Sequence, residues 1–330
     1  MKEFQALVTE EYEPNKYRRS VQSGNIDSIP DKHALIKVEY SSLNYKDALS
    51  ARGHKGISRF YPHTPGIDAA GIVEISGDGS YKSGDKVIVT GYDLGMNTNG
   101  GFGQYIVVPT DWIVPLPADM TLQESMIYGT AGFTAAICIH EMIKHDINPE
   151  TGKILVTGAT GGVGSMAVGI LSHLGYEVSA STGKSEFHDY LYSLGAKEII
   201  SREEVSESSS KPLLNGKWSG VVDNVGGNTL SSVIKSVIPH GCVCILGNVD
   251  GDTFSSTVYP FILRGITLTG IDSASRSMSL RLDLWNKLAG EWKFPNLHNT
   301  FKEVGLSELS DEIDIILRGG QVGRVVVKLW

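Results

Sequence analysis

The chain has 330 residues, of which 41% are hydrophobic and 20% are charged, and its net charge is -8. This composition is typical of a soluble globular protein with two domains, and the acidic balance argues against a general nucleic-acid binder. Three cysteines cannot build a disulfide framework and no apolar run approaches the length of a membrane span, so we expect a cytoplasmic protein that binds neither nucleic acid nor membrane.

Residues 1–124 are predicted to form a β-rich first domain. Turn clusters, rather than helices, separate short strand-like segments at 4–8, 34–40, 71–75, 86–90 and 104–108. The pattern changes at Thr121, because Thr121 and Glu124 have the spacing of a capping box and a helical run follows to Lys144. We therefore place the domain boundary at 124/125.

The stretch from Lys153 to Ala167 has the pattern strand, glycine turn, helix. Apolar and β-branched residues at 154–157 indicate a buried strand, and the run that follows has helical periodicity. The turn contains Gly158, Gly161, Gly162 and Gly164. Such glycines allow a tight turn and let a pyrophosphate approach the helix N-terminus, so a dinucleotide is expected here. The alternative is a glycine-rich loop without a ligand.

Strands and helices continue to alternate up to residue 272. Further strands are expected at 176–181, 197–200, 219–223, 242–246 and 266–271, with a helix at 187–194 and a solvated loop at 201–211. This order predicts an α/β fold, a doubly wound parallel sheet over residues 125–272. Cys242 and Cys244 would share one face of a strand, which favours core packing over a metal or redox pair.

The tail, residues 273–330, is predicted to return to the first domain. It contains two helical segments, 280–288 and 308–317, and a last strand at 324–329. The sheet of the second domain is already complete before this tail begins, so the tail is expected to pack elsewhere.

These segments resemble the medium-chain dehydrogenase/reductase superfamily across the whole chain. Its zinc-free quinone oxidoreductase branch is the most similar, and within it the YhdH/YhfP group that includes acrylyl-CoA reductases. The motifs that carry the resemblance are Ser42 to Asp47, Pro65 to Asp68, Gly84 to Val87, Gly100 to Gln104, Val156 to Gly164 and Ser181 to Lys184. The resemblance implies a GroES-like catalytic first domain and a Rossmann second domain.

Both zinc patterns of the superfamily are broken in this sequence. Zinc-dependent relatives bind metal through a Cys three residues before an Asp and a His-Glu pair after a glycine, where this chain has Asn44 before Asp47 and Ile67-Asp68 after Gly66. Residues 89–103 lack the four cysteines of the structural zinc lobe. Isoleucine cannot ligate a metal, so we expect no metal site and an already activated acceptor, a quinone or a C=C bond conjugated to a carbonyl.

The resemblance places Tyr45 and Asn44 at the substrate and nicotinamide. Tyr45 is expected to hydrogen-bond the acceptor oxygen or pass a proton, or alternatively to pack beneath the cofactor, while Asp47 is expected to cap its loop. The implied cofactor-binding residues are Thr130, Thr134, Thr160, Gly161, Gly162, Val163, Gly164, Ser181, Thr182, Gly183, Lys184, Arg202, Leu246, Gly247, Ser273 and Arg324.

The residues after the second strand of the Rossmann domain favour NADP over NAD. An acid that would bind a ribose 2′-OH is missing there, and Ser181, Thr182 and Lys184 offer hydroxyls and a cation, with Arg202 following the third strand. A 2′-phosphate would suit these donors, with NAD bound less well. The alternative is that Lys184 and Arg202 are only solvated.

A basic loop suggests the acceptor. Arg52, Lys55 and Arg59 would supply cations for the phosphates of coenzyme A, whereas a small quinone does not need them. The alternative is an ordinary solvated loop, because short basic runs are common. The sequence leaves three functions open: reduction of an α,β-unsaturated acyl-CoA, quinone reduction, and nucleotide binding without turnover. The strand at 266–271 is expected at the sheet edge, where a homodimer would form.

Overall fold

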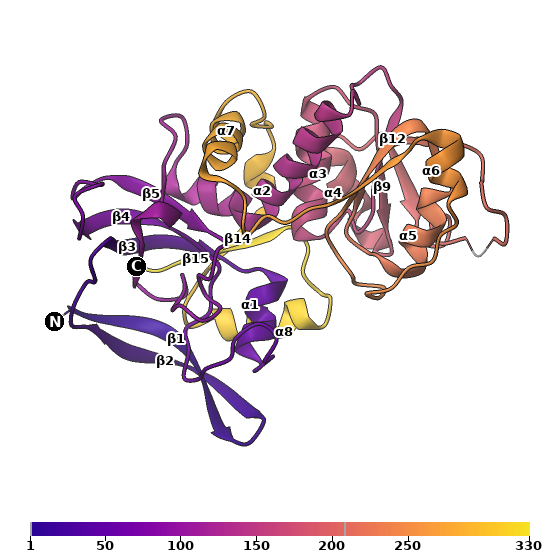
Figure 1. Cartoon of the computed structure of the whole chain (residues 1–330). Helices are drawn as coiled ribbons and strands as arrows, with labels where there is room; N and C mark the ends of the chain where they lie inside the picture. The colour runs from indigo at the N-terminus through magenta and orange to yellow at the C-terminus, as the bar shows by residue number, and fades with distance from the viewer. Residues whose placement is uncertain (1, 208) are drawn as a thin grey trace. The chain divides into compact units, whose positions relative to one another are not determined.

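The computed structural model describes residues 2–207 and 209–330, which fold into two compact units (Figure 1). The first unit extends to Thr130 and also contains Ala274–Gly290 and Thr300–Trp330. The second unit contains Ala131–Ser273 and Glu291–Asn299. The units therefore change a few residues after the expected boundary at 124/125, and residues 291–299 of the tail pack with the second unit instead of the first. The expected loop at 201–211 includes residue 208, which lies outside the described residues.

The first unit is built on a mostly antiparallel sheet with the order β14-β15-β3-β4-β5-β7, and β6 pairs with β3. Its strands are β3 (His33–Ser42), β4 (Asp68–Ser76), β5 (Lys86–Thr90), β6 (Tyr105–Pro109), β7 (Val114–Pro115), β14 (Phe301–Gly305) and β15 (Arg324–Lys328). A two-stranded hairpin, β1 (Lys2–Glu13) and β2 (Lys16–Ile26), completes the β structure. Buried Val, Ile and Leu side chains of these strands form the core of the unit.

Helices α1 (Tyr45–Ala51), α7 (Met278–Ala289) and α8 (Leu309–Leu317) lie wholly within the first unit. Helix α1 follows β3 directly and packs against α8 (Figure 1). The last strand, β15, pairs with β3 so that Val326 lies opposite Ser42. Arg324 at the start of β15 is thereby brought to the end of β3, where α1 begins.

The second unit contains a six-stranded parallel sheet with the order β10-β9-β8-β11-β12-β13. Its strands are β8 (Lys153–Val156), β9 (Val178–Thr182), β10 (Glu198–Ser201), β11 (Trp218–Asp223), β12 (Val237–Ile245) and β13 (Thr267–Gly270). Its helices are α3 (Gly162–His173), α4 (His188–Ser193), α5 (Gly227–Ile234) and α6 (Tyr259–Arg264). The strand order reverses between β8 and β11, so the predicted doubly wound fold is confirmed, and a ligand crevice is expected at the carboxyl ends of these two strands.

Helix α2 (Leu122–Lys144) contains a kink at Gly129, whose φ is 49° and ψ is -155°. Among the described residues, α2 is the helix whose length and apolar composition would allow it to cross a membrane. However, 83% of its most apolar 18-residue segment is buried inside the fold. Burial of this kind is what the core helix of a globular domain requires. The kink divides the helix just before Thr130, the last residue of the first unit in this segment.

Candidate functional site: a dinucleotide loop and a buried polar network

The glycine turn after β8 has the geometry of a phosphate-binding loop. Gly158 has a φ of +59°, and a Cβ on Gly164 would lie only 2.4 Å from the carbonyl oxygen of Gly158. Helix α3 begins at Gly162 without a side-chain cap and without an acidic residue in its first turn. The first backbone N–H groups of this 12-residue helix therefore point into the turn without an acidic competitor, which suits a dinucleotide pyrophosphate.

Polar contacts fix the loops on both sides of the point where the strand order reverses. Thr157 Oγ1 donates to Asp223 Oδ1 at 2.7 Å, and Asn224 Nδ2 donates to the Thr157 carbonyl oxygen at 2.7 Å. A Cβ on Gly247 would lie 2.1 Å from the carbonyl oxygen of Asn224, and Leu246 N–H donates to the Asp223 carbonyl oxygen at 3.1 Å. The structure thus brings the segment after β12 to the segment after β11, and both line the carboxyl edge of the sheet.

The residues expected to bind the 2′-phosphate gather at the ends of β9 and β10. Ser201 pairs with Thr182 in the parallel register, and Thr182 Oγ1 lies 3.3 Å from Thr160 Oγ1. A Cβ on Gly183 would lie 2.8 Å from Arg202 Nη2, so the guanidinium lies against the glycine backbone. The pKa of Lys184 is lowered by burial and by the charge of Arg202, while Glu186 opposes that shift. Two cations in one region favour an anionic ligand.

The remaining expected cofactor residues of the second unit have less specific surroundings. Thr134 is buried in the second half of α2, and Ser273 is half-buried in the segment after β13. Their expected contacts with a nicotinamide stay predictions.

In the first unit, the carboxylate of Asp68 is the centre of a buried network. Asp68 Oδ2 accepts from Ser42 Oγ at 2.7 Å, from Asn44 Nδ2 at 2.7 Å and from Thr130 N–H at 2.9 Å. Asp68 Oδ1 accepts from Thr130 Oγ1 at 2.5 Å. A buried carboxylate is stable only when such donors satisfy its oxygens, and here four donors do so.

The kink at Gly129 makes this arrangement possible. It interrupts the helical pattern immediately before Thr130, whose N–H then points to Asp68. A Cβ at Gly129 would lie 2.5 Å from both Asp68 Oδ2 and Ser42 Oγ. Two features of this position therefore require glycine: the positive φ and the close approach of the backbone to the carboxylate.

Arg324 supplies the positive charge of the network. The residue is 2% exposed, and all three guanidinium nitrogens donate to protein oxygens. The four acceptors are Ile127 O at 3.2 Å, Leu43 O at 3.2 Å, Asn44 Oδ1 at 3.3 Å and Ser42 Oγ at 2.8 Å. The return of β15 to β3 places the Arg324 guanidinium in this network, and the expected contact of Arg324 with the cofactor stays a prediction. Thr130, another expected cofactor residue, binds Asp68 through both its hydroxyl and its N–H, and its expected contact with the cofactor stays a prediction.

Asp47 is the second buried carboxyl group of the site. Its two oxygens accept from the N–H groups of Asn44 and Ile67, each at 2.8 Å, and with Asn44 it forms the capping box of α1. The expected cap is thus present. Burial, together with the charge of Asp68, raises the pKa of Asp47 from 3.8 to about 7, although the two N–H groups oppose the shift.

Tyr45 is the first residue of α1 and is 53% exposed. Its hydroxyl makes no hydrogen bond within the part of the chain that the structure describes, whereas its neighbour Asn44 is buried in the network. The pair therefore presents one fixed amide and one exposed phenol at the start of the helix. This exposure leaves the phenol accessible to an acceptor.

The three basic residues of the loop after α1 differ in their surroundings. Lys55 pairs with Glu11 at 3.1 Å and lies over the rings of Tyr17 and Tyr61. These contacts give Lys55 a structural role within the unit. Arg52 and Arg59 are exposed and form no ion pair with a described residue, so they are the better candidates for an external phosphate.

The positions that bind zinc in relatives are committed to other contacts. Ile67 is buried and apolar, and Asn44 and Asp68 bind protein groups. Among residues 2–207 and 209–330, no three His, Cys, Asp or Glu side chains are grouped as metal ligands. Cys138, Cys242 and Cys244 are free and buried, as expected for core residues, and the pKa of the Cys242 and Cys244 thiols is raised by thiol contacts and burial.

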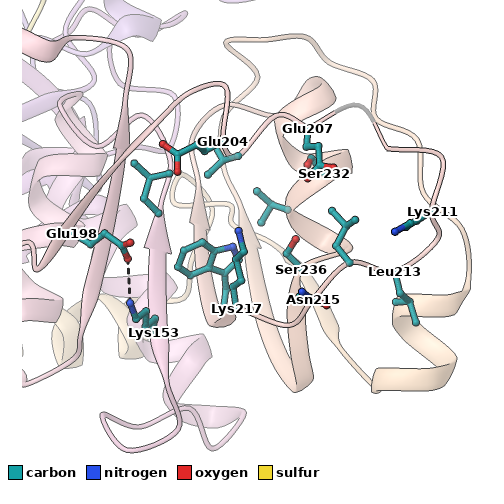
Figure 2. Close-up of a pocket in the computed structure, with 15 residues that line it drawn as sticks. Lys153, Glu198, Glu204, Glu207, Lys211, Leu213, Asn215, Lys217, Ser232 and Ser236 are labelled. Carbon is teal, nitrogen blue, oxygen red and sulfur yellow. Dashed lines mark hydrogen bonds and ion pairs between the residues drawn. The ribbon is translucent and has the colours of Figure 1, made fainter.

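A different pocket, with a volume of about 600 Å³, lies at the amino ends of β8 and β11 (Figure 2). Figure 2 shows the Lys153–Glu198 ion pair on one side, with an N–O distance of 3.2 Å, and Lys217 near the middle. The pocket is lined by three lysines and three glutamates, so their charges balance. Because it is at the opposite ends of the strands from the glycine loop and has no excess positive charge, it does not suit a dinucleotide.

Comparisons with known proteins agree with the fold of each unit. Residues 30–118 match the alcohol dehydrogenase GroES-like domain and residues 162–287 match the zinc-binding dehydrogenase family.

The chain also resembles individual proteins over nearly its whole length. It is 42% identical to the acrylyl-CoA reductase AcuI of Ruegeria pomeroyi over 98% of each chain. YhfP of Bacillus subtilis, provisionally named a quinone oxidoreductase, is 44% identical over 99% of each chain. Its structure with NAD bound has a TM-score of 0.96 and covers both chains completely. The yhdH oxidoreductase of Salmonella enterica, solved with NADP, is 39% identical, with a TM-score of 0.95, 99% of this chain covered and 100% of that chain.

The raised pKa of Asp47 leads to a pH-dependent stability. Between about pH 4 and pH 7 the folded protein keeps a proton on Asp47 that the unfolded chain releases, so this group stabilises the fold at low pH and the contribution is lost as the pH rises to about 7. Relative to Asp47→Asn, the free energy of unfolding of the wild type should fall by up to about 1.4 kcal/mol per pH unit in this window and level off above it.

Urea denaturation from pH 4 to 9 would measure this difference. The exposed Asp27 provides the matched control, and Asp27→Asn should give a curve parallel to the wild type. A wild-type curve that runs parallel to that of Asp47→Asn through this window would show that Asp47 is ionised throughout.

Proposed function

Because the chain belongs to the medium-chain dehydrogenase/reductase superfamily, in the group of quinone oxidoreductases and acrylyl-CoA reductases, we propose that it is a zinc-independent, NADPH-dependent reductase of an α,β-unsaturated acyl-CoA such as acrylyl-CoA. The observation that carries the proposal is the buried Asp68 network joined to an exposed tyrosine at the start of α1. The network fixes Asn44 at the position of a metal ligand without using a metal.

The cofactor assignment is supported by the fit of the loop residues to a dinucleotide phosphate. The uncapped start of α3 suits the pyrophosphate, and the region of Lys184 and Arg202 suits a 2′-phosphate. Bound NADPH would supply the hydride for the reduction. Relatives solved with NADP and with NAD support NADPH as the preferred cofactor and NAD as a weaker alternative.

The chain's own residues would then bind and polarise the acceptor. In this proposal the Tyr45 hydroxyl donates a hydrogen bond to the thioester oxygen, where negative charge develops when the β-carbon is reduced. Asn44, held through Asp68 and Arg324, keeps the start of α1 in place and so orients the tyrosine. A conjugated C=C bond is already activated, so hydrogen bonding alone can stabilise the developing charge.

Arg52 and Arg59 favour an acyl-CoA over a quinone. Coenzyme A carries a 3′-phosphate and a pyrophosphate, and an arginine guanidinium binds phosphate oxygens in a planar, bidentate manner. A quinone offers these cations no counter-charge. Quinone reduction remains the second candidate, favoured by the name of YhfP.

We further propose a cytoplasmic homodimer, supported by an apolar surface next to the edge strand β13. Val258, Ile262 and Leu263 in and before α6 are each more than 60% exposed, and α6 packs on β12 beside that edge. A second copy of the chain is the natural occupant, because a sheet edge paired with itself about a two-fold axis buries both features at once. The three free thiols agree with a reducing compartment.

Cofactor preference tests the first part of the proposal. Lys184→Glu should raise the KM for NADPH by roughly 10- to 100-fold, because it replaces a charge-assisted contact with repulsion, and should change the KM for NADH much less. Steady-state kinetics with both cofactors would measure this. Lys197→Glu, an exposed lysine after α4, is the matched control. Equal effects of Lys184→Glu on both cofactors would remove the 2′-phosphate assignment.

Acceptor preference tests the second part. The double variant Arg52→Ala/Arg59→Ala should lower kcat/KM for acrylyl-CoA at least about tenfold while leaving acrylyl-pantetheine, which lacks the phosphates, and simple quinones unchanged. Lys55→Gln should affect all three acceptors equally or not at all, because Lys55 already pairs with Glu11. The exposed Arg318→Ala is the control for general charge. A wild type that prefers quinones, together with a silent double variant, would favour the quinone reductase.

The dimer is tested by placing charges on the apolar surface. Ile262→Asp/Leu263→Asp should shift the mass found by light scattering from dimer to monomer, since two buried, unpaired carboxylates per copy oppose association. Tyr192→Asp, on the exposed face of α4, should leave the dimer intact. A wild-type protein that is monomeric at micromolar concentration would contradict the proposal.

A further inference from the structure

We propose that Arg281 is a positioning residue for the nicotinamide half of the cofactor. Its guanidinium holds the carbonyl oxygens of the segment that follows β13, and it thereby fixes Ser273, the residue of that segment expected to contact the nicotinamide. The inference rests on the proposed NADPH-dependent function, and it does not depend on which acceptor is reduced.

The first argument is the cost of burying this cation. Arg281 is 0% exposed, and it is the fourth residue of α7. The N-terminus of a helix carries a partial positive charge, so a cation in this position opposes the helix dipole, and burial also removes its hydration. Such a placement requires contacts that compensate both effects.

The second argument is that the guanidinium joins two stretches of backbone. Nη1 donates to the Thr90 carbonyl oxygen at 2.9 Å and to Thr90 Oγ1 at 3.1 Å, at the end of β5. Nη2 donates to the Ala274 carbonyl oxygen at 2.7 Å, and Nε donates to the Arg276 carbonyl oxygen at 3.2 Å. The donors of a planar guanidinium have fixed directions, so Arg281 holds residues 274–276 in one arrangement at the end of β5.

The turn after β5 also holds Ala274. The N–H group of Tyr92 donates to the Ala274 carbonyl oxygen at 3.0 Å. A Cβ on Gly91 would lie 2.9 Å from the Cα of Ala274, and the φ of Gly91 is +76°. The Tyr92 ring centroid is 4.4 Å from the Arg281 guanidinium carbon, and this cation–π contact stabilises the buried charge. The Tyr92 ring in turn stacks on Trp112 with a centroid distance of 5.2 Å.

The third argument is the position of Ser273 along the sheet of the second unit. The residues expected to bind the 2′-phosphate lie at the ends of β9 and β10, and the glycine turn follows β8. A dinucleotide that crosses the carboxyl edge from β9 over β8 places its nicotinamide half on the side of β11, β12 and β13. Ser273 follows β13 by three residues and is joined directly to Ala274. The contacts that fix Ala274 therefore restrict the position of Ser273.

The alternative is that Arg281 only stabilises the first unit. Adenosine 2′,5′-bisphosphate separates the two roles, because it carries the adenosine and the 2′-phosphate of NADPH but lacks the nicotinamide half. Loss of a positioning contact lowers the affinity for NADPH and NADH alike and leaves this fragment unaffected. A general loss of structure lowers the affinity for all three ligands.

Two variants displace the segment in different ways. Arg281→Lys keeps the charge and loses the forked donors. Gly91→Ala leaves Arg281 intact and places a Cβ against Ala274. Gly79→Ala is the matched control, because Gly79 has a φ of +72° and nothing within 4 Å of its Cβ position, so the variant has the same kind of backbone strain without the contact.

Isothermal titration calorimetry with NADPH, NADH and adenosine 2′,5′-bisphosphate would test the proposal. Arg281→Lys and Gly91→Ala should raise the Kd for both NADPH and NADH roughly 5- to 20-fold, and the Kd for the fragment should stay within about twofold of the wild-type value. Gly79→Ala should bind all three ligands as the wild type does. If Arg281→Lys does not fold, Tyr92→Leu, which removes the ring beside the guanidinium and keeps the backbone N–H, takes its place.

The outcomes separate this inference from the proposed function. A wild type that binds neither NADPH nor NADH would overturn the proposed function and this inference with it. A wild type that binds NADPH, with variants whose affinity for NADPH is unchanged or falls in parallel with that for the fragment, would overturn the inference alone. The titrations use no acceptor, so failure of the acyl-CoA assignment would leave them unchanged.

Discussion

The buried carboxyl group of Asp68 is the constraint on which the first unit depends. It lies at the first position of β4, and its oxygens are satisfied there because β3, the start of α1, the kink of α2 and β15 each bring a donor or a charge to it. These elements are far apart in the sequence, so the network also joins the N-terminal strands to the C-terminal return. Removing one donor would cost the network a hydrogen bond to a buried carboxyl oxygen, and such a loss costs about 1–3 kcal/mol.

The polar groups of the two units differ in whether they are open to a ligand or satisfied by other protein groups. The second unit leaves backbone N–H groups at the start of α3 open, with glycines that keep side chains away from an incoming phosphate. In the first unit the buried charges of Asp68 and Arg324 are satisfied by protein groups, and Tyr45 beside them is exposed. Binding specificity for the cofactor and rigid orientation of the reacting group are thereby separated, and changes in one need not disturb the other.

Much of this architecture could be predicted from the sequence, because buried parallel strands are short apolar runs bounded by turns, as at 154–157 and 219–223. The hairpin strand β2 and the edge strand β14 were missed, since both are mostly polar and lack a continuous apolar face. The burial of Arg324 was also not predicted, because a single basic residue at the start of a strand gives no sign that long-range pairing with β3 will bury it. The motif Pro65 to Asp68 and the glycine before Thr130 were the available signals for the network, but neither reveals the contact between them.

The identity of residue 44 follows from this network. Its side chain must donate to Asp68 and Asp47 and accept from Arg324, and Nδ2 and Oδ1 of Asn44 do this at 2.7, 3.2 and 3.3 Å. An amide has both donors and an acceptor without a charge. Aspartate would add another buried carboxyl group beside Asp47 and Asp68 and lose the donors, and a cysteine thiolate would bring charge with a soft ligand suited to zinc. Asn44 and Arg324 therefore act together in the network. The guanidinium supplies the positive charge, and the Asn44 amide accepts from it while donating to the carboxyl groups of Asp47 and Asp68.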